Sequence, residues 1–215
     1  MHGAYELWRA AVDSGVKPII GIEAYVTPET ARQDKTRVSW DTNWTPVPGH
    51  ARNPDDVSGG GLITHLTMWA ENDEGLVNLI KASSVANLEG RVMRYPRMDK
   101  EVLSTYSKGV IASSGCPSGI IQTRLRLGQF DEALRAAGEF QDIFGKDNFY
   151  IELMDHGLSI ESKVTGDLLT IAKKLGAPLL ATNDSHYVME ADKDAQDAML
   201  CICLLYTSPS PRDMR

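Results

Sequence analysis

The chain has 215 residues, of which 42% are hydrophobic and 24% charged, and its formal net charge at pH 7 is −7. These values are ordinary for a globular protein, and no apolar run or signal segment indicates a membrane span or export, so the sequence predicts a cytoplasmic protein without a membrane partner. The acidic balance argues against a dedicated duplex-binding module, because phosphate contacts need Lys and Arg.

Hydrophobic periodicity predicts helices and strands that alternate along the chain. Strands are expected at residues 18–26, 62–70, 109–113, 149–154 and 178–182. Helices are expected at residues 5–12, 74–88, 98–106, 120–127, 130–144, 159–175 and 190–201. Residues 29–60 are polar and rich in Pro and Gly. We expect them to form a long surface loop, much of which packs on nothing.

Repeated strand–helix units predict an α/β domain with a parallel sheet and right-handed crossovers. An open doubly wound sheet and part of a barrel are both compatible with five strands. From about Leu204 the periodicity disappears and Ser and Pro alternate. The sequence therefore predicts one domain over residues 1–203, followed by a non-native tail over residues 204–215 that packs on nothing.

Two segments that follow strands carry side chains capable of metal chemistry. Asp184 and His186 come directly after the last predicted strand, and residues two apart in extended backbone face the same side, so both can bind one metal. Cys116 lies in a glycine-flanked turn, which can bring a thiolate close to a metal or a substrate. Each motif alone also fits a simpler role: a helix cap and a surface histidine, or a buried or nucleophilic cysteine.

Two further candidates lie inside strands. Glu23 interrupts an apolar run, where burial of a carboxylate is costly unless it is paired, hydrogen-bonded or metal-bound. His65 also lies in an apolar run, where a hydrogen-bonded core histidine is the simpler interpretation. Asp155 and His156 are neighbours that face apart, so we expect them at most to support the site. Four strand regions thus supply the Glu, His, Cys and Asp ligands typical of zinc or manganese sites.

Five long phrases carry a resemblance to a known family. They are GAYELWRAAVDSGVKPIIGIEAYVTP, THLTMWAENDEGLVNL, SSGCPSGIIQTRLRLGQFDEA, FYIELMDHGLSIE and LLATNDSHYV, in this order between residues 3 and 188. They resemble the polymerase and histidinol phosphatase (PHP) domain of bacterial DNA polymerase III alpha subunits, and the actinobacterial ones in particular. The resemblance covers about residues 1–203.

The resemblance implies a distorted (β/α)7 TIM-like barrel with two or three zinc or manganese ions at its mouth. It implies that Glu23 bridges metals and that His65, Cys116, Asp184 and His186 are further ligands, with Asp184 and His186 at the catalytic centre. The implied activity is 3′–5′ exonuclease action on a DNA 3′ end, within a DNA-directed DNA polymerase. The implied partners are the rest of the polymerase chain and other replicase subunits, such as a sliding clamp or a proofreading subunit.

The sequence departs from the family pattern at its start, where the opening H-x-H, a following Asp or His, and the Asp-His-Gly before the first helix are absent. We therefore expect a barrel that is incomplete at the N-terminus, lacks four ligands and is inactive as this fragment. Two alternatives stay open. One is a catalytically silent module that stabilises the polymerase and docks a proofreading subunit. The other is a stand-alone phosphatase of the histidinol-phosphate type.

Overall fold

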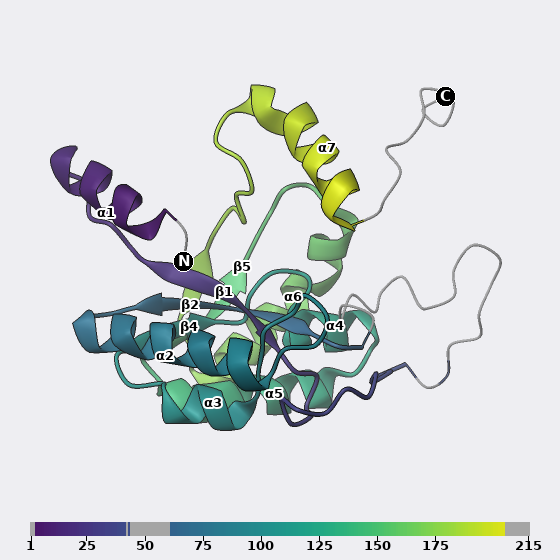
Figure 1. Cartoon of the computed structure of the whole chain (residues 1–215). Coiled ribbons are helices and arrows are strands. Elements are labelled where there is room, and N and C mark those ends of the chain that lie inside the picture. Colours follow the sequence, from purple (N-terminus) through teal and green to yellow (C-terminus); the bar gives the residue numbers. More distant parts are fainter. Residues whose placement is uncertain (1–2, 42, 44–60, 205–215) are drawn as a thin grey trace. The chain divides into compact units, whose positions relative to one another are not determined.

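The computed structural model describes residues 3–41, 43 and 61–204, and the chain divides into two compact units, Met1–Thr182 and Asn183–Arg215. The first unit carries a six-stranded sheet and helices α1 to α6, whereas the second carries the short helix η1 and α7. The α/β class expected from the sequence is confirmed (Figure 1). Among the described helices, none combines the length and the apolar character that crossing a bilayer requires.

The sheet has the strand order β3-β1-β2-β4-β5-β6. Its strands are β1 (Gly21–Val26), β2 (Thr64–Ala70), β3 (Arg97–Met98), β4 (Val110–Ser113), β5 (Phe149–Leu153) and β6 (Leu179–Ala181). Within the described residues the sheet ends at the edge strands β3 and β6 and does not close on itself. The sequence missed β3, because two residues are too few to carry a periodic pattern.

The expectation of a purely parallel sheet is wrong. Strand β2 runs antiparallel to both of its neighbours, β1 and β4, whereas the pairs β1–β3, β4–β5 and β5–β6 are parallel. A parallel pair needs a crossover, usually a helix, that carries the chain back to the starting edge. The described part of the connection between β1 and β2 contains no helix, and the chain enters β2 in the opposite direction.

The predicted helices are all present, with bounds that shift by few residues. They are α1 (Ala4–Asp13), α2 (Asp73–Glu89), α3 (Lys100–Thr105), α4 (Ile120–Arg126), α5 (Phe130–Phe144), α6 (Ser159–Leu175) and α7 (Lys193–Leu204), with η1 (Glu190–Asp192) before α7. Two of them begin at side-chain caps. Asn72 accepts a hydrogen bond from the Gly75 N–H at 3.0 Å, and Asp99 accepts one from the Val102 N–H at 3.1 Å.

Strands β1 and β2 have two different faces. The face against α2 carries Ala24, Val26, Leu66 and Met68, each at most 3% exposed. The opposite face carries Glu23, Tyr25, His65 and Thr67, which keep part of their surface accessible. Because side chains in a strand alternate between faces, burial of the apolar set against the helices directs the polar set to the other side.

Part of the predicted long loop packs firmly, which its polar composition did not indicate. Trp40 is only 7% exposed, and the Arg124 guanidinium lies over its ring at 4.2 Å from the centroid. Arg124 also pairs with Glu29, at the start of the same loop. The amphipathic indole and the ion pair attach this segment to α4. The rest of the loop, residues 42 and 44–60, and the tail from residue 205 lie outside the described residues.

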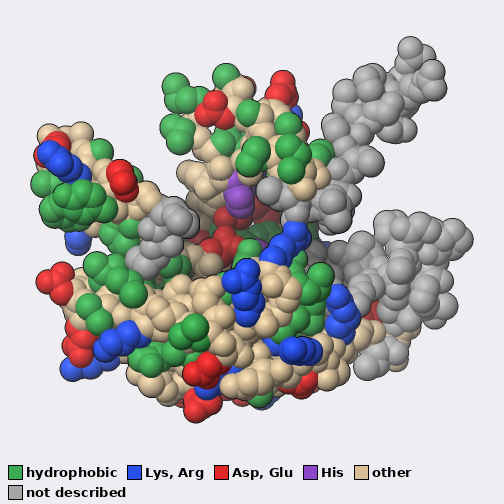
Figure 2. All heavy atoms as spheres, in the orientation of Figure 1, with side chains coloured by type: hydrophobic (Ala, Val, Ile, Leu, Met, Phe, Trp, Pro, Cys, Tyr) green, Lys and Arg blue, Asp and Glu red, His purple; other side chains and the backbone are tan. Residues whose placement is uncertain are grey.

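Helix α1 contacts little of the unit, and none of its residues is buried. Its large apolar side chains Tyr5, Leu7, Trp8 and Val12 are 45–64% exposed, and Figure 2 shows them as a green group at the upper left. The helix ends where the sequence predicts, since Gly15 follows it in the left-handed conformation with φ of 70°.

A buried arginine ties the segment after β1 to β3. Arg97 is 0% exposed, and its guanidinium donates hydrogen bonds to four backbone carbonyl groups, those of Gly90, Leu62, Arg32 and Asp34, at 2.7–3.3 Å. Buried donors need such partners, because an unsatisfied one costs about 1–3 kcal/mol. The guanidinium of Arg97 therefore holds the backbone of the segment after β1 in place against β3.

Asp99 completes the attachment of the loop. Its carboxylate accepts from the Arg32 N–H at 2.9 Å and pairs with the Arg32 guanidinium at 3.1 Å, in addition to capping α3 through Val102. Burial raises the pKa of Asp99, but the backbone hydrogen bonds from Arg32 and Val102 and the Arg32 charge outweigh burial and lower it. The ionised form is thus the one that the fold stabilises.

We predict that Asp99→Ala lowers the free energy of unfolding by about 2–4 kcal/mol at pH 7, because it removes a cap and a partly buried ion pair. Since the folded pKa is depressed, this stability is present above about pH 4 and is lost as the pH falls through the lowered pKa. The difference between wild type and variant in denaturant titrations should therefore shrink from about pH 5 to about pH 3. Glu101→Ala, which removes an exposed partner of the same Arg32, should cost less than about 1 kcal/mol. An undiminished difference at about pH 3 would contradict this assignment.

Candidate metal centre

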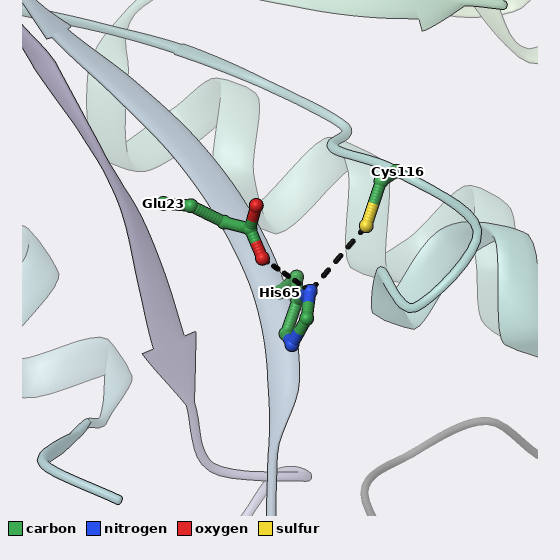
Figure 3. A group of neighbouring side chains, drawn as sticks. All are labelled: Glu23, His65 and Cys116. Atoms are coloured by element: carbon green, nitrogen blue, oxygen red, sulfur yellow. Dashed lines mark hydrogen bonds and ion pairs between the residues drawn. The ribbon is translucent and has the colours of Figure 1, made fainter. Parts of the chain in front are cut away.

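Three of the predicted site residues lie together on the open face of the sheet. Glu23 comes from β1, His65 from β2 and Cys116 from the loop after β4 (Figure 3). The distance between Glu23 Oε1 and His65 Nδ1 is 2.5 Å, and that between His65 Nδ1 and Cys116 Sγ is 3.4 Å. The three ligand atoms all lie within 4.8 Å of one another, so this Glu–His–Cys triad is a possible metal site.

The register of β1 and β2 produces the contact between Glu23 and His65. Tyr25 lies directly opposite His65, and Glu23 lies directly opposite Thr67, so Glu23 and His65 are diagonal neighbours on one face. The antiparallel direction of β2 also explains why His65 stands early in its strand. Because the two strands are antiparallel, β2 begins beside the C-terminal end of β1. The C-terminal ends of strands are where α/β enzymes place catalytic groups.

The cysteine loop is held in place by hydrogen bonds from β2 and from α4. The His65 N–H donates to the Ser118 carbonyl at 3.0 Å, and Gln122 Nε2 donates to the Gly115 carbonyl at 2.6 Å. Gly115 has a φ of 78°, and a Cβ at this position would lie 3.1 Å from the His65 carbonyl oxygen. A side chain here would be strained and tight, so the glycine lets the loop bring Cys116 to His65.

Electrostatics in the triad keep a proton on His65. Burial lowers the pKa of His65, but hydrogen bonds to Cys116 and Glu23 and the charge of Glu23 outweigh it and raise the pKa to about 10. The imidazole is therefore protonated at neutral pH when no metal is bound. A protonated imidazole offers no lone pair to a cation, so metal binding must displace this proton.

The burial expected for Glu23 is wrong. Its side chain is 37% exposed, compared with 22% for that of His65, whereas Cys116 as a residue is 8% exposed. Glu23 has apolar neighbours in the sequence because those neighbours face the helices. Its own side chain points to the opposite, accessible face of the sheet. It needs no buried counter-charge, and it remains accessible to solvent or to a substrate.

Asp184 and His186 belong to the second unit. The expected extended backbone is wrong here, because Asp184 has a φ of 44°, in the left-handed region that Asp tolerates better than most residues. His186 Nδ1 lies 2.7 Å from the Asp184 carbonyl oxygen and 4.0 Å from Asp184 Oδ1. The two side chains are neighbours in one short segment. Their convergence with Glu23, His65 and Cys116 stays a prediction.

Sequence reasoning missed a buried carboxylate near the triad. Glu152 of β5 is 4% exposed and accepts hydrogen bonds from Ser113 Oγ, at the end of β4, and from Thr182 Oγ1, just after β6, the latter at 2.5 Å. The Glu152 N–H donates to Ser114 Oγ at 2.9 Å. A glutamate inside an apolar strand was the available signal, the same signal that pointed to Glu23.

His156 also has a defined partner. Its Nδ1 lies 2.6 Å from Glu161 Oε1, and its backbone N–H donates to Glu161 Oε2 at 2.8 Å. Burial raises the pKa of Glu161, but the hydrogen bonds from His156 outweigh burial and lower it. This pair joins the end of β5 to the start of α6.

Comparison with known proteins now identifies the family. The PHP domain family model matches residues 1–156. The chain belongs to the PHP domain family. Its relatives include the DNA polymerase III subunit alpha of Mycobacterium leprae, 48% identical over 94% of this chain and 16% of that protein, and that of Saccharopolyspora erythraea, 50% identical over 94% and 17%. That of Borreliella burgdorferi is 37% identical over 94% of this chain and 16% of that protein.

The resemblance stated from the sequence is thereby confirmed, including its actinobacterial character, since identity is higher to the first two relatives than to the third. The chain spans about one sixth of the length of these relatives. The mixed α/β structure agrees with the PHP fold, although its sheet does not close into a barrel within the described residues.

We predict that this PHP chain binds Co²⁺ through the triad, with a near-ultraviolet thiolate-to-cobalt absorption band. Cys116→Ser should abolish the band and weaken Co²⁺ binding at least about tenfold, because the sulfur ligand is lost. Cys201→Ser, in α7, is the matched control and should keep both. The assignment of Cys116 as a ligand would be contradicted if the absorption band kept its wild-type intensity in Cys116→Ser, or if the band were lost in Cys201→Ser but not in Cys116→Ser.

Proposed function

We propose that residues 1–203 are the PHP domain of a DNA polymerase III alpha subunit, a DNA-directed DNA polymerase of bacterial replication. We further propose that the site removes nucleotides from a DNA 3′ end in a metal-dependent 3′–5′ exonuclease reaction. The Glu–His–Cys triad on an open sheet face carries this proposal. The relatives that bear the name DNA polymerase III subunit alpha support the identity of the parent protein. Residues 204–215 remain proposed as a non-native tail.

Of the two proposed metals, zinc fits the donor set of the triad better than manganese, because Cys116 offers a thiolate, a soft ligand that Mn²⁺ binds poorly. One carboxylate oxygen, one imidazole nitrogen and one thiolate sulfur lie close enough to share a cation, and Asp184 and His186 are proposed to complete the set. A bound divalent cation supplies polarisation of a phosphate oxygen and an activated water. Before binding, His65 holds a proton between Glu23 and Cys116, and this proton leaves when the imidazole becomes a ligand.

The charge of the chain favours a metal-dependent reaction over catalysis by the side chains alone. A net charge of −7 and the carboxylate of Glu23 at the site both repel a phosphodiester. Glu23, His65 and Cys116 would hold a cation whose charge would reverse this local sign and favour approach of the scissile phosphate to the same face. The proposed partners are accordingly the DNA 3′ end, the rest of the polymerase and other replicase subunits such as a clamp or a proofreading subunit, in the cytoplasm of a bacterium.

The alternative is a silent structural module within the same polymerase, which docks a separate proofreading subunit. Such a module gives no physical reason for Glu23 to stay accessible beside His65, or for a left-handed glycine to bring Cys116 to both. The names of the relatives disfavour a stand-alone phosphatase. The two remaining readings differ in whether the intact protein degrades a 3′ end.

We predict that Asp184→Asn in the full-length polymerase lowers metal-dependent exonuclease activity at least about 100-fold, because loss of a ligand should exceed the roughly 10–100-fold effects of outer residues. Primer extension should be unchanged, since polymerisation belongs to another domain. The measurement pairs removal of a mismatched 3′ nucleotide, with zinc or manganese present, with extension of a matched primer. Asp197→Asn, an exposed acid in α7, is the matched control and should retain both activities.

The results of this paired assay distinguish the exonuclease hypothesis from the silent structural module. A wild-type polymerase that removes no 3′ nucleotide with either metal supports the silent module. A folded Asp184→Asn protein that loses extension together with exonuclease activity contradicts the separation of the two sites.

A further inference from the structure

An aromatic ladder leads from the triad to the surface. We use this name for Tyr25 and Tyr95, together with Arg94. The Tyr25 ring packs on the His65 ring at a centroid distance of 5.4 Å, and the Tyr95 ring meets Tyr25 edge-on at 5.2 Å. The Arg94 guanidinium lies 5.2 Å from the centroid of Tyr95 and donates a hydrogen bond to its hydroxyl at 3.1 Å.

A tight hairpin turn presents the outer end of the ladder. Val92 and Tyr95 exchange two backbone hydrogen bonds of 3.0 Å, which leaves Met93 and Arg94 at the tip of a two-residue turn. Met93 has a φ of 55°, a left-handed conformation that is costly for a residue with a side chain, and it is 74% exposed. A two-residue hairpin turn requires a positive φ at its first central position, so the turn itself accounts for this conformation of Met93.

The hairpin concentrates positive charge in an acidic chain. Residues 90–97 read GRVMRYPR, with three arginines and no acidic residue, although the whole chain carries 29 acidic and 22 basic residues. Arg97 is buried and serves the fold, whereas Arg91 and Arg94 are exposed. The same short segment therefore offers cations and an aromatic ring beside the triad, which is the combination that binds single-stranded nucleic acid.

We propose that Tyr25, Tyr95 and Arg94 bind the terminal nucleotide of an unpaired DNA 3′ end, with the base against the two rings and a backbone phosphate at the arginine. This inference rests on the proposed function, because it assigns the substrate contact of the same site. Every base has a π-face, so stacking accepts any terminal base but requires that it be unpaired. Because the inner ring touches His65, a base held on the ladder lies next to the triad that would act on its phosphodiester.

The first test compares single-stranded oligothymidylates whose 3′-terminal nucleotide either carries its base or is abasic, in the full-length polymerase. Wild type should process the base-bearing end with a KM about tenfold lower than the abasic end, given the usual value of one base–aromatic stack. Tyr95→Leu should remove this difference while kcat changes little, and Tyr95→Phe should restore it. Arg94→Gln should raise the KM of both ends together. The Co²⁺ absorption band should persist in all three variants, because none of these residues is a ligand.

The matched controls are Tyr5→Leu and Arg9→Gln, which change exposed side chains of the same types in α1. Both should leave kcat and KM at wild-type values. Equal KM values for the two ends in the wild type would overturn the proposal. So would a difference between the ends that persists in Tyr95→Leu.

The second test does not need catalysis. An oligothymidylate with a 3′-terminal 5-iododeoxyuridine is irradiated on the polymerase in the presence of a chelator, and the adduct is located by mass spectrometry. The expected adduct is on Tyr25 or Tyr95, and it should move away when the iodinated base is placed six nucleotides from the end. Adducts only elsewhere in the polymerase overturn the proposal. An adduct on the ladder in a protein without exonuclease activity keeps the binding site and rejects the proposed function, so the two failures are distinguishable.

Discussion

The reversed direction of β2 is the constraint on which the site depends. If β2 ran parallel to its neighbours, a histidine at its start would lie at the N-terminal ends of the strands, away from the cysteine loop, which follows the C-terminal end of β4. Antiparallel pairing with both β1 and β4 instead brings His65 to the C-terminal ends of those two strands. Burial of Leu66 and Met68 against the helices then fixes which face His65 takes. A slip of one residue would turn the histidine into the core, so hydrophobic burial sets the geometry of the candidate ligands.

The helices and most strands could be predicted because their signal is local. Helices α5 and α6 have the predicted bounds, since each carries a helical pattern that ends at a glycine, Gly145 after α5 and Gly176 after α6. The direction of β2 could not be predicted, because an alternating pattern is the same in both directions. The packing of Trp40 was missed for another reason: its partner Arg124 is distant in sequence, and composition alone says nothing of such a contact.

The candidate site shows the same division. Residue type and position near strand ends were enough to propose Glu23, His65 and Cys116, which the fold brings together. Their environment was harder to foresee, because the exposure of Glu23 depends on which face the helices cover. The ladder was missed because Tyr25 and Tyr95 are ordinary strand and turn residues, and only the pairing of β1 with β3 and the hairpin before it place their rings in contact.

The remaining question is what holds in place the loops that carry the proposed ligands, since loops are the least rigid part of such a site. Glu152 offers a physical answer. Its buried carboxylate joins Ser113, which precedes the cysteine loop, to Thr182, which precedes the segment of Asp184 and His186. The departure points of both loops are therefore fixed by one side chain from the strand between them. Buried hydrogen bonds of this kind are costly to break, because each partner would be left unsatisfied. The rigidity that a metal site needs thus comes from the sheet rather than from the loops themselves.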